Sequence, residues 1–167
     1  VDSEDLRGVG IEALMVNAFH LMLRPGADRI KRLGGLHRFV GWEGPIVTDS
    51  GGFQALSLIR ENAKNGTIRP DGLLFRTPEG KKVHLTPQRC IRTQLALGSD
   101  VLVALDDCAP ANATPEECAE SVERTVRWTR ACREELDKAP LRNRPRPLMV
   151  GVVQGGADLA LRTQCAE

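Results

Sequence analysis

The sequence predicts an α/β protein in which strands alternate with helices and pair as a parallel sheet. The main observation is a set of four short apolar runs, each closed by polar residues or glycine, at residues 13–20, 45–52, 100–108 and 148–156. Near-continuous aliphatic runs are typical of strands buried on both faces of a parallel sheet. Because helical patterns separate the runs, the sheet is either open and doubly wound or part of a (β/α)8 barrel.

The segments between the runs carry recognisable helix ends. Residues 25–39 predict a short helix after the first run, closed by a pair of glycines. Residues 85–100 predict a second helix, with Thr86 as its N-cap and Gly98 as its stop. A proline directly after this N-cap fits the first helical position, where a backbone N–H is not needed.

Residues 113–140 predict the longest helix. Thr114 and Glu117 have the spacing of a capping box, and Pro140 lies beyond the end. A mostly apolar face of helical period is formed by Cys118, Val122, Val126, Thr129 and Leu136. This pattern is typical of an amphipathic helix.

One segment interrupts the alternation of strands and helices. Residues 65–85 contain Asn-Gly, Asp-Gly and Glu-Gly turns between short β-prone pieces. Such turns predict a β-hairpin insertion and not a helix.

Composition and charge exclude several classes of protein. The net charge of +1 gives no bulk electrostatic case for nucleic acid or for a membrane surface, and the basic segment 141–147 is most simply a solvated loop. No apolar run approaches the roughly 18 residues of a membrane helix, and no signal-peptide pattern opens the chain. Neither GxGxxG nor GxxxxGK(S/T) follows the first run, which counts against dinucleotide and P-loop sites.

The five cysteines are scattered along the chain and form no CxC or CxxC pair. This usage argues for a reducing cytoplasm and against a disulfide framework or a metal site within this chain. The three histidines have no metal-ligand spacing, so we expect them to be structural or exposed. Both ends look cut, because Val1 is no initiator and the last residues read as an interrupted helix. We therefore expect a piece of a larger protein.

Polar side chains close all four apolar runs. They are Asn17, Asp49, Ser50, Asp106, Asp107 and Gln154. In both candidate architectures, ligands gather at the carboxyl ends of parallel strands. We therefore expect these residues to converge on one pocket, where carboxylates and an amide recognise a substrate.

Packing offers a second interpretation of these and neighbouring residues. Asp49 or Asp106 could be only the N-cap of the helix that follows. Gly51 and Gly52 could permit a tight turn, or could let the backbone approach a ligand closely. Residue type alone favours a core position for Phe53, and a role as small apolar filler for the cysteine at position 108.

Four segments together resemble one known family. They are NAFHLMLRPG, GGLHRFVGWEGPIVTDSGGFQ, LGSDVLVALDDC and VGVVQGG, in collinear order along almost the whole chain. They are similar to the bacterial type of queuine tRNA-ribosyltransferase, the tRNA-guanine transglycosylase. The resemblance implies a (β/α)8 TIM barrel with an inserted zinc subdomain. Residues 1–167 would then be a partial catalytic domain of about four βα units, without the zinc subdomain and the second half of the barrel.

The resemblance also implies a reaction. The family exchanges the wobble guanine of tRNA for a 7-deazaguanine, in bacteria the 7-aminomethyl form, during queuosine biosynthesis. It does so by double displacement through a covalent enzyme–RNA intermediate, the logic of a retaining glycosidase. Asp49 matches the proton-transfer aspartate of the family's DSGG(F/Y) motif. The nucleophilic aspartate and the zinc ligands, three cysteines and a histidine, would lie beyond Glu167, so we expect this chain alone to be inactive.

The implied partners are tRNA, the 7-deazaguanine base and a second copy in a cytoplasmic homodimer. Asp106 resembles the residue that accepts the two adjacent donors of guanine, N1–H and the 2-amino group. Gln154 resembles the amide that donates to the carbonyl O6. Cys108 matches the pocket residue of the bacterial type, which favours the aminomethyl substrate. The complete implied pocket consists of Asp49, Ser50, Gly51, Gly52, Phe53 (against the face of the base), Asp106, Cys108 and Gln154.

Two other functions remain open. One is a non-catalytic partner subunit of the same fold, although the intact motif around Asp49 speaks against it. The other is an unrelated TIM-barrel enzyme that acts on a small anionic metabolite, in which Gly51 and Gly52 would hold a phosphate.

Overall fold

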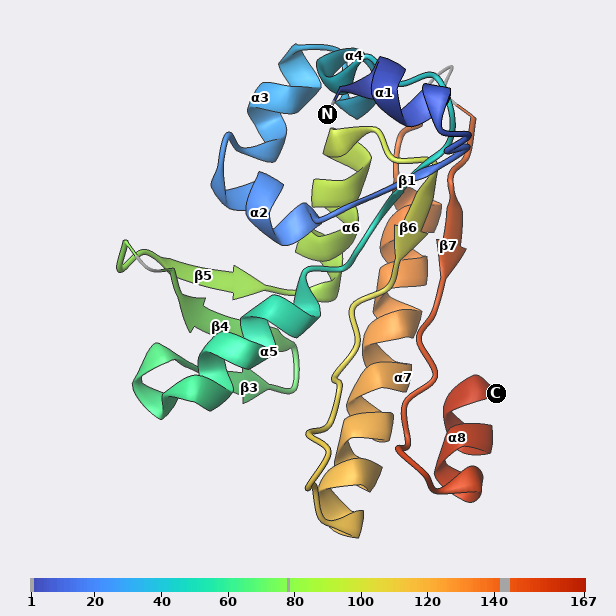
Figure 1. The fold of residues 1–167 in the computed structure, drawn as a ribbon. Coiled ribbons are helices and arrows are strands. Elements are labelled where there is room, and N and C mark those ends of the chain that lie inside the picture. Colours follow the sequence, from blue (N-terminus) through green and yellow to red (C-terminus); the bar gives the residue numbers. More distant parts are fainter. Residues whose placement is uncertain (1, 78, 142–144) are drawn as a thin grey trace.

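The structure is a computed structural model that describes residues 2–77, 79–141 and 145–167. Its central element is a parallel sheet whose strands pair in the order β1-β2-β6-β7 (Figure 1). These strands are β1 (Leu14–Val16), β2 (Ile46–Thr48), β6 (Val101–Val103) and β7 (Leu148–Val150). The order follows the chain without a reversal, as in part of a barrel and unlike a doubly wound sheet. The predicted α/β fold with a parallel sheet is confirmed, and within the described residues the sheet is open.

Helices flank the sheet. They are α1 (Ser3–Gly8), α2 (Ala18–Leu23), α3 (Ala27–Arg32), α4 (Leu36–Val40), α5 (Gly52–Glu61), α6 (Pro87–Leu97), α7 (Pro115–Lys138) and α8 (Leu159–Ala166), with a 3-10 turn η1 (Ala63–Asn65). Figure 1 shows α1, α3 and α4 gathered near one end of the sheet, with α7 running along it. Within the part of the chain that the structure describes, no helix is long and apolar enough to cross a membrane.

The helix ends that the sequence predicts are present in α6 and α7. Thr86 Oγ1 accepts the N–H of Arg89 at 3.2 Å, and Gly98 ends α6 in the left-handed conformation with φ 80°. Thr114 and Glu117 form the reciprocal capping box of α7. Side-chain acceptors at these positions satisfy N–H groups that the first helical turn leaves unpaired.

Several element boundaries differ from the predictions. Each apolar run provides only three strand residues, and the run at residues 13–20 passes into α2 at Ala18. The predicted helix at residues 25–39 is two helices, α3 and α4, and α5 is an additional helix with no predicted counterpart. The predicted face of α7 is also rotated. Of the five residues proposed, only Val122 and Leu136 are buried. Ser121 and Thr125, which were not proposed, lie on the buried side of the helix.

The interruption at residues 65–85 is a three-stranded antiparallel sheet where a two-stranded hairpin is predicted. Its strands are β3 (Gly66–Arg69), β4 (Gly72–Arg76) and β5 (Lys82–Leu85), paired in the order β3-β4-β5. We call this unit the meander. The Asp-Gly turn joins β3 to β4, whereas the Asn-Gly pair only opens β3. A third strand gives the unit enough apolar surface to pack against the rest of the protein.

The core has two parts. The larger part lies between the meander, α5, α6 and α7, and includes Phe75, Leu105 and Trp128. The smaller part lies beneath α2 to α4 and includes Trp42. The prediction that both faces of the parallel strands are buried is wrong for the described residues. Met15 in β1 and Leu148 and Val150 in β7 are exposed. Helices cover one face of the sheet, and the other face remains apolar and open.

The basic segment at residues 141–147 is described only in part. Residues 142–144 lie outside the described residues, so the solvated loop stays a prediction there. Arg146 pairs with Asp137 near the end of α7. This part of the segment is therefore attached to the helix by an ion pair.

Candidate active site

Three of the predicted polar side chains meet beyond the carboxyl ends of their strands. Gln154, four residues after β7, donates from Nε2 to Oδ2 of Asp106 at 2.7 Å. Ser50, two residues after β2, places its Oγ 3.5 Å from the other carboxylate oxygen of Asp106. Parallel neighbouring strands end at the same edge of a sheet, so the topology brings these residues together. The result is a carboxylate flanked by an amide and a hydroxyl.

Asp49 follows β2 directly, and its carboxylate is held at the start of α2. One oxygen accepts the backbone N–H of Ala18 at 2.7 Å, and the other accepts Nδ2 of Asn17 at 2.7 Å. Asn17 itself caps α2 by accepting the N–H of His20. Asp49 is therefore not the N-cap of the following helix, a position that Gly51 occupies. The N-cap interpretation is also wrong for Asp106, which no helix follows directly.

Both carboxyl groups have a raised pKa. Burial raises the pKa of Asp106 above its usual 3.8, although the hydrogen bonds from Gln154 and Ser50 act in the opposite direction. Burial likewise raises the pKa of Asp49, against the effect of the Ala18 N–H. Partly buried carboxylates that titrate above their normal range are typical of groups that bind or exchange protons with a ligand.

The raised pKa of Asp106 predicts a pH-dependent stability difference. Below the usual value of 3.8 the carboxyl is protonated in the folded and unfolded states, and its contribution to stability is complete. As pH rises through the folded pKa, that contribution is lost, because the folded state must then hold a partly buried charge. An asparagine in its place does not titrate. We therefore expect the stability of Asp106→Asn relative to the wild type to increase as pH rises from the usual value of 3.8 through the raised pKa of folded Asp106.

Thermal unfolding of both proteins over this pH range measures the difference. Every other titrating group is common to the two proteins, so their contributions cancel. A stability gap that stays constant or shrinks as pH rises would show that the folded pKa of Asp106 is not raised.

Gly51 and Gly52 are needed where the chain turns from β2 into α5. Gly51 has φ 73°, in the left-handed region that glycine adopts most easily. At Gly52, a Cβ would lie 2.9 Å from Leu105 Cδ1 and 3.2 Å from the backbone oxygen of Asp106. The tight-turn interpretation thus explains Gly51, close packing explains Gly52, and contact with a ligand stays a prediction.

Phe53 is on the surface, with 62% of its area exposed, so the interpretation as a core residue is wrong. It lines a hollow of about 550 Å³ between α2 and α5, together with Phe19, Leu58 and other residues. The hollow lies beside the α2 residues that hold Asp49. An exposed aromatic ring in this place can stack on a planar ligand, because ring faces pair well with other π systems.

Asp107 does not join the site, contrary to the expectation that all strand-end carboxylates converge. Its side chain is 1% exposed and pairs with Arg124 of α7 at 2.6 Å and with Arg60 of α5 at 3.5 Å. Ser121 donates to its carbonyl oxygen, and Thr125 Oγ1 accepts its N–H. A buried charge needs such compensation, so Asp107 anchors the loop that carries Asp106.

Loss of the Arg124 partner should destabilise the protein. We expect Arg124→Ala to lower the free energy of unfolding by about 3 kcal/mol, because a buried carboxylate loses its shorter ion pair. Arg60→Ala is the matched control, and its longer ion pair predicts a smaller loss. Chemical denaturation of the three proteins tests this order. Equal stability of Arg124→Ala and the wild type would show that Asp107 does not depend on the pair.

Cys108, His37 and His84 contact neighbouring groups of the protein, whereas His20 is exposed. Cys108 is half-buried against the larger core, in agreement with a small apolar filler, and a contact with substrate stays a prediction. His37 bridges the carbonyl of Trp42 and the carboxylate of Asp100. His84 lies 3.4 Å from Asp71. These contacts agree with structural roles for His37 and His84.

Within residues 2–77, 79–141 and 145–167, no group of three or more His, Cys, Asp or Glu residues could hold a metal ion. These described residues therefore do not provide a ligand set for the zinc that the resemblance implies. All five cysteines are free thiols. A zinc ion thus enters no step derived from these residues.

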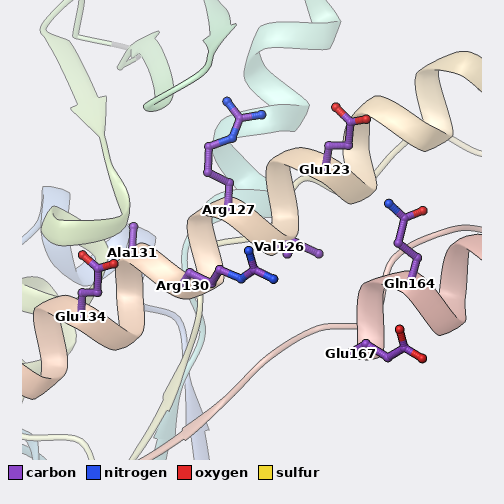
Figure 2. Close-up of a pocket in the computed structure, with 8 residues that line it drawn as sticks. All are labelled: Glu123, Val126, Arg127, Arg130, Ala131, Glu134, Gln164 and Glu167. Carbon is purple, nitrogen blue, oxygen red and sulfur yellow. The ribbon is translucent and has the colours of Figure 1, made fainter.

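A second hollow lies outside the site. It measures about 700 Å³ and is bordered by α7 and α8, as Figure 2 shows. Its lining mixes charges of both signs, with Arg127 and Arg130 near Glu123 and Glu134. None of the predicted site residues contributes to it.

The fold and the site define a class of protein: a parallel α/β protein with a cluster of polar side chains beyond the carboxyl ends of its strands. Comparison with known proteins makes this specific. The family model described as queuine tRNA-ribosyltransferase matches residues 1–167. The chain belongs to the queuine tRNA-ribosyltransferase family.

Curated relatives agree with this family. A queuine tRNA-ribosyltransferase of Cereibacter sphaeroides is 43% identical over 164 residues, which cover 98% of this chain and 41% of that protein. Another from Thermus thermophilus is 42% identical over 160 residues, which cover 95% of this chain and 39% of that protein. The chain thus spans about two fifths of the length of the curated relatives it matches.

Proposed function

We propose that this chain is part of a tRNA-guanine transglycosylase, which exchanges the wobble guanine of tRNA for 7-aminomethyl-7-deazaguanine. The observation that carries the proposal is the contact of 2.7 Å between the Asp106 carboxylate and the Gln154 amide. One group only accepts hydrogen bonds when ionised, and the other can donate. Side by side, they complement the edge of guanine, which presents two donors next to a carbonyl.

Base selection follows from this pairing. The Asp106 carboxylate accepts N1–H and the 2-amino group, and Gln154 turns its Nε2–H from Asp106 to the carbonyl O6. Adenine has an acceptor at N1, which would face the carboxylate and leave both unsatisfied. A site built around specific donors rejects such an analogue strongly. The ring of Phe53 would cover the face of the base, and the target nucleotide must leave its stack to reach the pocket.

Asp49 is proposed to handle the proton of the exchange. Guanine leaves the ribose as an anion that needs a proton, and the entering base must lose one from N9. A carboxyl group with a raised pKa suits both transfers, since it changes protonation state more readily near neutral pH. Its present bonds to Asn17 and Ala18 hold it in a resting position. Proton transfer requires that one oxygen leaves the start of α2.

For the whole protein we also propose a closed barrel, a nucleophile, a zinc site and a homodimer. The parallel sheet would form part of a closed TIM barrel, whose interior would cover the exposed aliphatic face of β1 and β7. The nucleophilic aspartate and the zinc ligands would come from outside these 167 residues. The whole protein would act in the cytoplasm as a homodimer.

The two alternative functions are less well supported. A phosphate-binding barrel enzyme would need free backbone N–H groups at the glycines, but the Gly52 N–H donates to Ser50 Oγ at 3.1 Å. A non-catalytic subunit would not need a carboxyl with a raised pKa at position 49.

Exchange of labelled guanine tests the proposal. The full-length protein is incubated with a tRNA transcript that has guanine at the wobble position, and incorporation of the label is measured. A transcript with adenine at that position is the control. We expect label only in the first tRNA. If the protein binds the base but incorporates no label, the non-catalytic subunit is favoured. If the protein binds neither base nor tRNA, the proposal is contradicted.

A further inference from the structure

Positive charge is concentrated in one part of the chain. Residues 64–92 have a net charge of +5, against +1 for the whole sequence. The basic residues in this range are Lys64, Arg69, Arg76, Lys81, Lys82, Arg89 and Arg92, and the acidic ones are Asp71 and Glu79. Most of this range is the meander. The rest of the chain is therefore acidic overall, and the near-neutral total hides a local cationic surface.

The meander presents these charges on one face. Side chains alternate along a strand, and the apolar set, Leu73, Phe75, Val83 and Leu85, is buried in the larger core. The other face is therefore the outer one, and it carries Arg69 of β3, Arg76 of β4 and Lys82 of β5. Arg76 and Lys82 stand directly opposite each other in the register of β4 and β5. Like charges in adjacent positions repel, so this arrangement calls for an anionic partner.

The three cations of this face are not paired with acidic side chains of the described residues. Among the described residues, Arg69, Arg76 and Lys82 form no ion pair. The two acids of the meander face other groups: Asp71 lies 3.4 Å from His84, and Glu79 pairs with Arg24 at 2.8 Å. The three cationic side chains are therefore available to a ligand.

The meander is fixed in place near the candidate site. It follows α5, which begins three residues after Asp49, and it packs with α5 in the larger core. The Trp128 indole of α7 donates to the carbonyl of Pro70 in the β3–β4 turn at 2.9 Å. The Phe75 ring lies 5.4 Å from that of Phe19 in α2. These contacts fix the meander beside α2, whose start holds Asp49, and beside α7 (Figure 1).

We propose that the outer face of the meander, formed by Arg69, Arg76 and Lys82, binds the phosphate backbone of the RNA substrate beside the nucleotide undergoing exchange. This inference rests on the proposed function, because tRNA is the anion that the site would receive. Phosphate contacts position a nucleic acid without reading its sequence. Binding here would hold the strand while the target base enters the pocket, and an anionic lipid surface is the competing occupant.

The test compares two triple variants of the full-length protein. Arg69→Gln/Arg76→Gln/Lys82→Gln removes the proposed contacts. Arg29→Gln/Lys31→Gln/Arg32→Gln removes the same charge from α3, which Figure 1 shows away from the meander. The probe is unmodified tRNA with guanine at the wobble position, measured over a series of salt concentrations. Calorimetry with 7-aminomethyl-7-deazaguanine shows whether each variant keeps a folded base site.

We expect the meander variant to bind tRNA at least roughly tenfold more weakly at low salt, and its log–log salt slope to fall by about 2–3. The slope of the α3 variant should stay at the wild-type value, and base affinity should be unchanged in both. Wild-type tRNA affinity in the meander variant, or equal losses in both variants, would overturn the inference. So would a loss of binding to phosphatidylserine vesicles without any loss for tRNA. Failure of the wild type itself to bind tRNA would instead contradict the proposed function.

Discussion

Asp49→Asn should slow guanine exchange by about 10²–10⁴-fold in the full-length protein, with tRNA affinity nearly unchanged. The substitution keeps the shape of the side chain but removes its ability to take up and release a proton. Because the nucleophile of the exchange would be another residue, a covalent RNA adduct should still form slowly. Single-turnover exchange measures the chemical step, and filter binding measures the affinity for tRNA.

Asn17→Ala is the matched control for this variant. It leaves in place the Asp106 carboxylate, which we propose to bind the base. It also breaks the contact of 2.7 Å between Asn17 and Asp49 while it keeps the carboxyl group of Asp49. If Asp49 acts through proton transfer, Asn17→Ala should lose far less activity than Asp49→Asn. Comparable losses in both would assign Asp49 a structural role at the start of α2, and near-wild-type exchange by Asp49→Asn would refute the catalytic role.

Asp106→Asn should weaken binding of the free base by roughly 2–4 kcal/mol, which corresponds to about 30-fold to 1000-fold in affinity. One acceptor oxygen becomes an NH2 group, which must face either the donors of the base or the Nε2 of Gln154. Both choices leave buried donors unpaired. Ser50→Ala is the control, because its Oγ is already 3.5 Å from the carboxylate and its loss should matter little. Titration calorimetry that finds less than a threefold change for Asp106→Asn would exclude this assignment.

Much of the candidate site could be predicted because it depends on local rules. Asp49, Ser50, Asp106 and Gln154 each follow an apolar run, and parallel pairing alone brings such residues to one edge. The N-caps of α6 and α7 could be predicted for the same reason, because capping depends on residues close in sequence. The family resemblance rested on the same short segments, and the family match covers the whole chain.

The features that sequence reasoning missed depend on contacts between distant residues. Asp107 has the same residue type and neighbourhood as Asp106, and only the approach of Arg60 and Arg124 from two helices turns it away from the site. The buried side of α7 includes Ser121 and Thr125 because they bind the Asp107 backbone. A pattern search for apolar residues cannot identify such a face.

A crystal structure of the full-length protein with 7-aminomethyl-7-deazaguanine tests the central claim most directly. We predict that both oxygens of Asp106 accept hydrogen bonds from N1–H and the 2-amino group, and that Gln154 donates to O6 in place of its contact with Asp106. The ring of Phe53 should lie against the face of the base. A base bound elsewhere, or bound here with Gln154 still donating only to Asp106, would contradict the account.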